Sequence, residues 1–507
     1  MRMTMKTIMA ATLAITAWLV APAGDHVTIV AVNDTHSQIE PASDGQGGVA
    51  RRRAIYDHYR ALNPEGTVVV HAGDAVQGSV FFTLYEGEVE YALIDSLGYD
   101  MVILGNHEFD NGLESLAKFY KNVKATRLSA NYDMSGTPLE GMFQPYRIMR
   151  FGDKKVGFFG INITPKGLIG EKNYEGMHYL LSSDVADATA KYLKEVQKVD
   201  YAVMISHIGY DSYDPTEPND TTIIRRSHYI DLVVGGHSHT VIKPDSEFDR
   251  IPNADGKLIV VGQNGKSGKL VGIYDLDLET GKVSYKHEAV NDKWDNAARK
   301  YVAMDNWLNH YRAGVDSLMN NPLCVSDMEW KNGNDASQNW VCDVTLDIIG
   351  KISGIKNVDL VIMNKGGIRT SMPRGTITEG LLMSMFPFDN RYVVLDISGK
   401  DLLEALDVMA GRGGDALSRG MEVTFNEAGK VTSAKLKGKK IDPKKRYKVA
   451  TINYLSGGGD YMTPLTRANV IFTDEVKYGD HIINYAREMG KAGKHLTTDE
   501  KPRMVKK

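Results

Sequence analysis

MVILGNHEFD, residues 101–110, joins an apolar run to a polar cluster with only one glycine between them. Residues 101–104 predict a short buried strand. Asn106, His107, Glu108 and Asp110 follow almost at once. An ordinary polar loop would explain this stretch taken alone, whereas a functional site at the end of a core strand would explain why several chemically active side chains gather there. The rest of the chain favours the second explanation.

The same pattern recurs along the first half of the chain. Apolar, strand-like runs alternate with helix-like segments, which predicts an α/β layered domain. The strand-like runs are 27–32, 67–72, 101–104, 155–161, 201–207, 231–236 and 258–263, and the helix-like segments include 49–62, 86–97, 112–122 and 183–198. In such domains the loops at the carboxyl ends of the strands collect the functional groups.

Five of these strand-like runs end in Asp, Asn or His. A single histidine or aspartate at such a position is usually a structural or turn residue. The set is different, because chance would rarely put all of them at strand ends. We therefore expect these residues to meet on one edge of one sheet. They are Asp34 and His36, Asp74, Asn106 and His107, His207, and His237 and His239.

The residue types in this set predict divalent metal ions. Carboxylate, amide and imidazole groups suit first-row divalent metals, and the set contains no thiolate. Seven candidate ligands are too many for one tetrahedral ion, which takes three or four. Two ions that share a bridging carboxylate fit the number, and such pairs promote in-line phosphoryl displacement.

The first 23 residues predict a signal peptide. Arg2 and Lys6 precede an apolar run at 7–20, and Ala21, Pro22 and Ala23 complete a cleavage site. A membrane anchor is the alternative, but the run is shorter than the roughly 20 residues of a membrane span. We expect export to the periplasm, the cell surface or the medium, with no stable membrane anchor after cleavage.

Charge and cysteine content limit the partners further. Without Arg2 and Lys6 the chain has 58 basic and 64 acidic residues, a net charge of −6. This balance does not suggest a nucleic-acid partner, although a local site can still bind a small anion. Cys324 and Cys342 are the only cysteines. A disulfide and two free thiols both remain open, because sequence does not give their separation.

The remaining chain predicts a connector and a second domain. Residues 292–320 read as one long helix, which we interpret as the connector. The predicted division is a signal peptide at 1–23, a catalytic domain at 24–290, a connector helix at 291–322 and a second domain at 323–507. In the second domain, strands are predicted at 358–364, 391–399, 421–425 and 447–455, and helices near 337–352, 378–385 and 400–410.

Taken in order, five blocks of the first domain resemble the calcineurin-like metallophosphoesterases. They are DTH (34–36), GDAVQG (73–78), GNHEFD (105–110), SH (206–207) and GGHSH (235–239). NDTHSQIEP (33–41) and GDAVQGS (73–79) narrow the resemblance to the 5′-nucleotidase family, which includes UDP-sugar hydrolases. The resemblance implies a four-layer α/β sandwich metallophosphoesterase domain, followed by a smaller mixed α/β substrate-binding domain.

The resemblance also implies roles for the polar set. Two divalent ions, Zn, Mn or similar, would be bound. Asp34 and His36 match the ligands of one ion, with His239 as a further candidate. Asp74 matches the bridging ligand. The residues that match the second ion's ligands are Asn106, His207 and His237.

GNHEFD contains two further candidates. His107 matches a catalytic residue that stabilises the phosphoryl charge or protonates the leaving group. Asp110 can accept a hydrogen bond from the other ring nitrogen, which would orient the imidazole and favour its cationic form. For Glu108 we expect only a surface or helix N-terminal charge.

Three blocks of the second domain are similar to the family's substrate-binding blocks. They are NKGGIR (364–369), FPFDN (386–390) and NYLSGGGDYM (453–462). The similarity implies that Asn364 and Arg369 contact the substrate and that Phe388 and Tyr454 stack on a base. It also implies that Asp460 accepts hydrogen bonds from ribose hydroxyls.

The second domain departs from the family pattern at several positions. Lys365 replaces a glycine, and Tyr454 stands where Phe is usual. Gln338 stands where a glycine is expected. A further phosphate-binding arginine has no clear equivalent, and Lys331 is the nearest candidate.

These observations predict an exported phosphohydrolase that acts on nucleoside 5′-phosphates, a small-molecule substrate, with attack by a hydroxide that the metals hold. No obligate protein partner is evident. The alternatives are a UDP-sugar hydrolase and a 2′,3′-cyclic-nucleotide phosphodiesterase. A thiosulfate-ester hydrolase is a weaker alternative, because it would not need the two aromatic rings. A non-catalytic nucleotide-binding protein would not need the complete ligand set.

Overall fold

The computed structural model describes residues 20–21, 25–211 and 217–507. The predicted signal peptide therefore lies outside the described residues, apart from β1 (Val20–Ala21), which pairs with β7 (Tyr146–Phe151). Within the described ranges, no helix is both long and apolar enough to cross a membrane.

The first domain contains two large sheets. One has the order β15–β14–β2–β3–β4–β5, and the other has the order β1–β7–β8–β10–β11–β13–β12. The strands of the first sheet are β2 (His26–Val32), β3 (Thr67–His71), β4 (Met101–Ile103), β5 (Thr126–Leu128), β14 (Leu270–Asp277) and β15 (Val283–Ala289). Those of the second, besides β1 and β7, are β8 (Lys154–Asn162), β10 (Tyr201–His207), β11 (Leu232–Val234), β12 (Arg250–Pro252) and β13 (Leu258–Gly262).

The central strands are buried on both faces, as parallel strands covered on each side usually are. In β2, Ile29 and Ala31 belong to the core between the two sheets, whereas Val30 and Val32 pack into the core beneath the outer helices. Successive side chains of a strand point to opposite faces, so one apolar run supplies both cores. This explains why these runs are continuously apolar.

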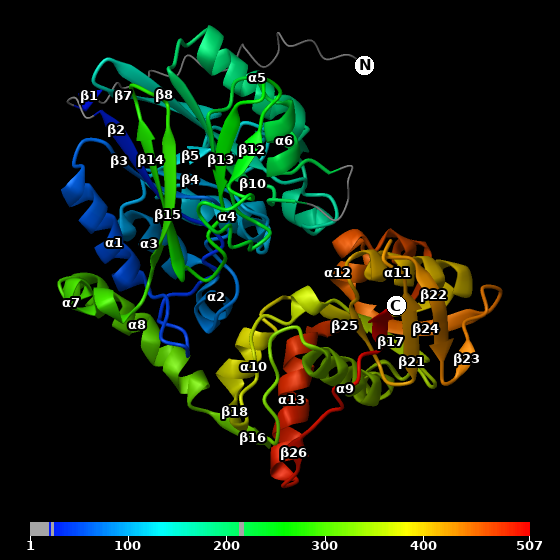
Figure 1. Ribbon diagram of the computed structural model, residues 1–507. Helices are drawn as coiled ribbons and strands as arrows, with labels where there is room; N and C mark the ends of the chain where they lie inside the picture. The colour runs from blue at the N-terminus through cyan, green and yellow to red at the C-terminus, as the bar shows by residue number, and fades with distance from the viewer. Residues whose placement is uncertain (1–19, 22–24, 212–216) are drawn as a thin grey trace.

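Helices cover the outer faces of both sheets and complete a four-layer sandwich (Figure 1). The helices on the first sheet include α1 (Val49–Leu62), α2 (Val80–Tyr85), α3 (Glu88–Leu97) and α4 (Gly112–Tyr120), and those on the second include α5 (Ser182–Glu195) and α6 (Asp220–Arg226). The predicted fold class is confirmed. The expectation of a single sheet was wrong: β2, β3 and β4 lie in one sheet, and β10 and β11 in the other.

The connector is not one continuous helix, as the sequence had predicted. It consists of a short 3-10 turn, α7 (Asp295–Ala298) and α8 (Val302–Met319). The break falls at Tyr301, where the backbone leaves helical geometry. The Tyr301 hydroxyl donates to Asp57 Oδ2 of α1 at 2.8 Å, which ties the break to the surface of the first domain.

The second domain is built on a five-stranded mixed sheet of order β20–β17–β24–β19–β25, with smaller sheets of order β18–β16–β26 and β23–β22–β21–β27. Its strands are β16 (Pro322–Ser326), β17 (Leu360–Met363), β18 (Gly375–Thr378), β19 (Arg391–Ser398), β20 (Ala416–Leu417), β21 (Met421–Phe425), β22 (Val431–Leu436), β23 (Lys439–Lys440), β24 (Arg446–Ile452), β25 (Asn469–Lys477), β26 (His495–Leu496) and β27 (Met504–Lys506). Its helices are α9 (Asp335–Ser353), α10 (Glu379–Met385), α11 (Gly399–Gly411), α12 (Asn453–Ser456) and α13 (Tyr478–Lys491). Cys324 and Cys342 are buried free thiols, which settles the question that the sequence left open.

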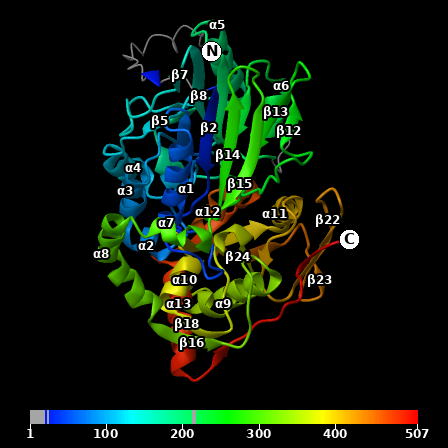
Figure 2. The same cartoon turned by 60° about the vertical axis from the view of Figure 1, so that its left-hand side comes forward.

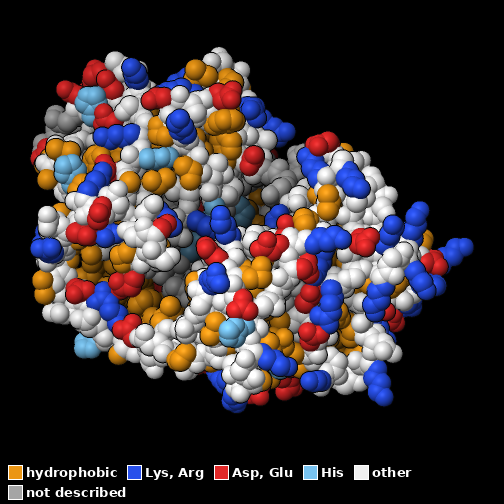
Figure 3. Space-filling model, turned by 60° about the horizontal axis from the view of Figure 1, so that its bottom comes forward, with side chains coloured by type: hydrophobic (Ala, Val, Ile, Leu, Met, Phe, Trp, Pro, Cys, Tyr) orange, Lys and Arg blue, Asp and Glu red, His pale blue; other side chains and the backbone are white. Residues whose placement is uncertain are grey.

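The two domains face each other across a hollow. Figure 1 shows the first domain above and the second below and to the right, with α8 descending at the lower left from the first domain toward the second. Figure 2 shows α11 and α12 beside the lower end of the first domain. In the space-filling view of Figure 3, histidine side chains lie at the bottom of the hollow between the two lobes.

Candidate functional site

The loops that follow β2, β3, β4, β10 and β11 meet at one end of the sheet sandwich. Parallel strands of both sheets end there, so two sheets contribute to one cluster. The cluster contains three groups of histidine and acidic side chains whose potential ligand atoms lie within 4.8 Å of one another. These groups are Asp34, His36 and His239; Asp74, His207 and His237; and His36, Asp74 and His107.

Asp34 is fully buried at the centre of the cluster. Its Oδ2 accepts from Asn33 Nδ2 at 2.7 Å and from the backbone N–H of His237 at 2.9 Å. Its Oδ1 lies 3.3 Å from His239 Nε2. One oxygen is therefore fixed by the chain while the other faces the histidines.

His36 and His239 come from different sheets and place their Nε2 atoms 2.9 Å apart. The two rings meet edge to face, with their centroids 4.9 Å apart. The structure thus brings His239, the least certain of the sequence candidates, close to both Asp34 and His36.

Asp74 connects the two sides of the cluster. Its Oδ1 accepts the backbone N–H of His107 at 2.9 Å, and its Oδ2 lies 3.2 Å from His207 Nε2. His207 Nδ1 donates to the Ala72 carbonyl at 2.7 Å, which leaves Nε2 to face the cluster. His237 Nδ1 lies 3.0 Å from Asn106 Oδ1.

The loops after β2 and β3 remain paired beyond the ends of their strands. The N–H groups of Asp34, His36 and Ser37 donate to the carbonyls of Gly73, Asp74 and Ala75 at 2.9, 3.1 and 3.0 Å. Backbone hydrogen bonds therefore fix the position of one ligand loop against the other.

Several residues of the cluster adopt left-handed backbone conformations, which cost non-glycine residues energy. They include Asp34, His36, Asp74, His237 and His239. A close approach also makes glycine necessary at position 105, because a Cβ there would lie 2.1 Å from Asp74 Oδ1. Such conformations are typical of functional sites, where geometry takes precedence over local stability.

The electrostatics of the cluster keep the carboxylates ionised. Burial alone would raise the pKa of Asp34, but His239 and His207 outweigh it and hold this pKa well below its ordinary value. Burial would likewise raise the pKa of Asp74, but the nearby His207 and His107 outweigh burial and hold this pKa well below its ordinary value. Burial lowers the pKa of His237 to about 3, so its imidazole is neutral at pH 7 and can donate a lone pair.

The residues present fit divalent metal ions. Asp34 Oδ1 and His207 Nε2 are buried and find no hydrogen-bond partner among the described residues. Buried polar atoms are normally paired, and both of these atoms point into the cluster. Carboxylate oxygens and imidazole nitrogens in this arrangement suit Zn or Mn.

His107 lies at the edge of the cluster nearest the second domain. Its Nδ1 is 3.0 Å from Asp110 Oδ2, as the sequence spacing suggested. Burial alone would lower the pKa of His107, but Asp110 and Asp74 outweigh burial and raise it. The ring therefore favours the cationic form, as expected for a group that faces an anion.

Glu108 is only 3% exposed, so the expectation of a surface charge was wrong. Its carboxylate accepts the backbone N–H groups of Asp74 at 3.0 Å, Ala75 at 2.7 Å and Gly105. Glu108 thus joins the loop that carries Asp74 to the loop that carries Asn106. Its apolar neighbour Phe109 is fully buried too, but a single aromatic residue in a polar stretch does not reveal which carboxylate is buried beside it.

The second domain brings Arg369 and Phe388 against the cluster. Arg369 Nη2 lies 3.4 Å from both ring nitrogens of His36. The Arg369 guanidinium lies over the Phe388 ring, 5.6 Å from its centroid, and Phe388 lies 5.8 Å from the His107 ring. The substrate-binding candidates and the metal-binding candidates therefore share one site.

The other second-domain candidates form a network around Asp460. Its Oδ2 accepts from Asn364 Nδ2 and Arg412 Nη2, each at 2.8 Å, and its Oδ1 accepts from the Tyr454 hydroxyl at 2.9 Å. Across the domain boundary, the Asp460 N–H donates to the Gly167 carbonyl at 2.7 Å. Sequence reasoning missed Arg412, which lies 48 residues before Asp460.

The departures from the family pattern have local explanations. Lys365 Nζ donates to the Arg412 carbonyl at the end of α11, at 3.1 Å, so this lysine stabilises the domain itself. Gln338 donates to the Gly333 carbonyl at the start of α9. Lys331 is exposed, and its neighbour Asn332 donates to the Arg369 carbonyl.

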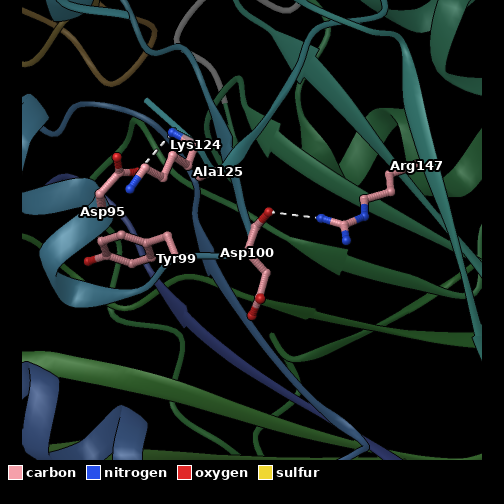
Figure 4. A pocket seen from close by; sticks show the side chains of 6 residues that line it. All are labelled: Asp95, Tyr99, Asp100, Lys124, Ala125 and Arg147. Atoms are coloured by element: carbon pink, nitrogen blue, oxygen red, sulfur yellow. Dashed lines mark hydrogen bonds between the residues drawn. The ribbon is translucent and has the colours of Figure 1, made fainter. Parts of the chain in front are cut away.

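A separate surface cavity of about 230 Å³ lies at the opposite, amino-terminal end of the strands (Figure 4). It is lined by Asp95, Tyr99, Asp100, Lys124, Ala125 and Arg147. Arg147 donates to the Asp100 carbonyl, and the Lys124 N–H donates to Asp95. None of the site candidates lines this cavity, so its size does not make it the functional site.

Comparisons with known proteins find a family match in each half of the chain. The family model of the calcineurin-like phosphoesterases matches residues 27–241, and that of the 5′-nucleotidase C-terminal domain matches residues 319–467. The chain is 26% identical to an apyrase of Tabanus yao, over 91% of each chain. It is 25% identical to the protein UshA of Escherichia coli K12, over 86% of each.

A solved structure extends the likeness to the arrangement of the whole chain. The 5′-nucleotidase precursor of Thermus thermophilus is 26% identical and superposes with a TM-score of 0.81, over 95% of this chain and 99% of that one. Both domains are therefore included in the match. The chain is a calcineurin-like phosphoesterase with a 5′-nucleotidase C-terminal domain, and thus a hydrolase that acts on phosphoester bonds.

Proposed function

We propose that this chain is an exported enzyme that releases phosphate from nucleoside 5′-phosphates and uses two divalent metal ions. The observation that carries the proposal is the meeting of Arg369 and Phe388 with the metal-binding candidates around His36 and His107. An anion-binding guanidinium and an aromatic ring beside such a cluster suit a substrate with one phosphate and one flat group. The leader-like sequence of residues 1–23 supports export.

The metal ligands would divide into two sets. Asp34, His36 and His239 would hold one ion, and Asn106, His207 and His237 the other, with Asp74 between them. This division is supported by the groups in which the side chains approach one another. When bound, the two ions would neutralise phosphoryl charge and lower the pKa of a water molecule.

His107 would act on the phosphate from the side that faces the second domain. Its cationic ring would stabilise negative charge on the phosphoryl oxygens or donate a proton to the leaving oxygen. Asp110 would hold the ring through Nδ1, so that Nε2 faces the substrate. The catalytic pair is thus His107 and Asp110.

The second domain would choose and orient the substrate. Arg369 would bind the phosphate, because a guanidinium presents paired donors to phosphate oxygens. Phe388 and Tyr454 would stack on the base. Asn364 and Asp460 would bind the sugar side. We propose the catalytic domain at 24–290, the connector at 291–322 and the substrate-binding domain at 323–507.

The test is a substrate panel with the mature protein. AMP, UDP-glucose and a 2′,3′-cyclic nucleotide are assayed separately with Mn and with Zn, and kcat/KM is compared. We expect AMP to have the highest kcat/KM. A large preference for the cyclic diester or for UDP-glucose would replace the proposed substrate while keeping the chemistry, and no turnover of any of the three would contradict the proposal.

A further inference from the structure

The carboxylate of Asp460 is almost saturated by the chain itself. A carboxylate has about four acceptor positions, two on each oxygen. Asn364 and Arg412 fill both positions of Oδ2, and the Tyr454 hydroxyl fills one position of Oδ1. Counted over the described residues, one position on Oδ1 remains.

The Tyr454 hydroxyl is held as a donor to Asp460. It is 2.9 Å from Asp460 Oδ1 but 3.3 Å from the Gly167 carbonyl, so its single hydrogen goes to the carboxylate. The hydroxyl also accepts the Asp460 N–H at 3.2 Å. Burial and the charge of Asp460 raise the pKa of Tyr454 well above its ordinary value, which keeps the hydroxyl protonated.

Asp460 cannot turn easily to expose more of its carboxylate. Its backbone is left-handed, with φ of 54°, and its N–H donates to the Gly167 carbonyl. Arg412 donates two hydrogen bonds to Asp460, one to the backbone carbonyl at 3.0 Å and one to Oδ2. Arg412 is itself held 3.4 Å from the buried Asp415.

From this geometry we infer that the Tyr454 hydroxyl is a specificity determinant that replaces one sugar hydroxyl at Asp460. The inference rests on the proposed nucleoside pocket and goes beyond it. With one acceptor position left, Asp460 binds one sugar hydroxyl and does not hold both members of a ribose 2′,3′-diol. The pocket therefore takes ribonucleoside and deoxyribonucleoside 5′-phosphates alike.

The test measures binding of nucleosides that lack a phosphate, so it does not depend on turnover. Dissociation constants of adenosine, 2′-deoxyadenosine and 3′-deoxyadenosine are measured by calorimetry with the full chain and with Tyr454→Phe. In the unsubstituted chain we expect at least one deoxynucleoside to bind within about twofold of adenosine, since one hydrogen bond is kept. In Tyr454→Phe we expect both to bind roughly tenfold more weakly than adenosine, because the freed acceptor can take the second hydroxyl.

The control is Tyr447→Phe, which removes a hydroxyl from the same domain. That hydroxyl accepts the Asp442 N–H in the turn before β24. We expect the three dissociation constants of this variant to equal those of the unsubstituted chain, and thermal unfolding verifies that both variants fold.

The outcomes separate this inference from the proposed function. It is overturned if the unsubstituted chain already binds both deoxynucleosides at least tenfold more weakly than adenosine, if Tyr454→Phe leaves the ratios unchanged, or if no nucleoside binds. AMP hydrolysis is assayed in parallel. The expected binding pattern without AMP hydrolysis refutes the proposed function alone, whereas AMP hydrolysis without that pattern refutes this inference alone.

Discussion

The two halves of the site satisfy their polar groups in opposite ways. In the first domain, the buried Asp34 Oδ1 and His207 Nε2 have no hydrogen-bond partner within the described part of the chain. In the second domain, Asp460 accepts three hydrogen bonds from side chains of its own domain. The first half thus has lone pairs that are free to bind cations. A ligand of the second half must instead compete with hydrogen bonds that already exist within the domain. We therefore expect substitutions to act mainly on chemistry in the first half and on selectivity in the second.

The largest expected effect is that of Asp74→Asn, which removes the charge at the centre of the first half. Activity should fall at least about 10³-fold, because the cluster then loses several kcal/mol of charge stabilisation. Phosphate release from AMP and bound metal, measured by elemental analysis, check this. Asp153→Asn removes a charge from an exposed turn and should leave both unchanged. Retained activity in Asp74→Asn would contradict the assignment of the chemistry to the first half of the site.

Next in size is His107→Ala. The loss of a positioned acid–base or charge-stabilising group should lower kcat by about 10²- to 10⁴-fold. Metal content should stay the same, because His107 is not assigned as a ligand. A suitable control is His495→Ala, which breaks a histidine–aspartate pair on the surface, 2.6 Å from Asp327. Full activity in His107→Ala would show that the metals act without it.

Glu108→Gln tests whether the hydrogen bonds of Glu108 position the loops that carry Asp74 and Asn106. A glutamine cannot accept all three backbone N–H groups, because its amide nitrogen is a donor. We expect metal affinity to weaken by about 10- to 100-fold, as for other residues that orient ligands. Metal titration of the apo-protein measures it. Glu114→Gln makes the same chemical change on the exposed side of α4 and should have no effect. Equal metal affinity in the two variants would mean that the hydrogen bonds of Glu108 to the two loops are not needed for metal binding.

The smallest of these effects is expected for Arg369→Lys, where the two halves meet. The lysine keeps the charge but loses the paired donors, so KM for AMP should rise by roughly tenfold with a smaller change in kcat. Arg374→Lys, at an exposed position nearby in sequence, serves as the control. A fall in kcat as large as that of His107→Ala would show that Arg369 acts in the chemical step and not only in substrate binding.

The sequence predicted the elements of the first domain well, because their apolar runs are long and continuous. It failed where the cause lies outside the local sequence. The predicted single sheet became two, since strands such as β2 and β10 have the same apolar character and sequence does not show which strands pair. The connector breaks at Tyr301, whose hydroxyl donates to Asp57, 244 residues away, a contact that no local sequence pattern reveals.

The candidate site shows the same limit at the level of single residues. Every candidate drawn from a strand end of the first domain lies in one cluster, because the carboxyl ends of parallel strands meet there. Glu108 and Arg412 could not be recognised, because their partners are distant in sequence and, for Glu108, are backbone N–H groups that no residue type reveals. Long-range contacts to the backbone leave no pattern in the sequence.

The pairing of the loops after β2 and β3 has a consequence for how this site can change. The hydrogen bonds from Asp34, His36 and Ser37 to residues 73–75 join two loops whose residues Asp34, His36 and Asp74 have left-handed backbones, so the separation of these candidate ligands depends on how the two loops are paired. An inserted or deleted residue in either loop would shift the register of these hydrogen bonds and move the candidate ligands relative to one another. Replacing a side chain leaves that register intact. A change of loop length at this end of the molecule would therefore displace several candidate ligands at once, whereas a substitution changes one side chain.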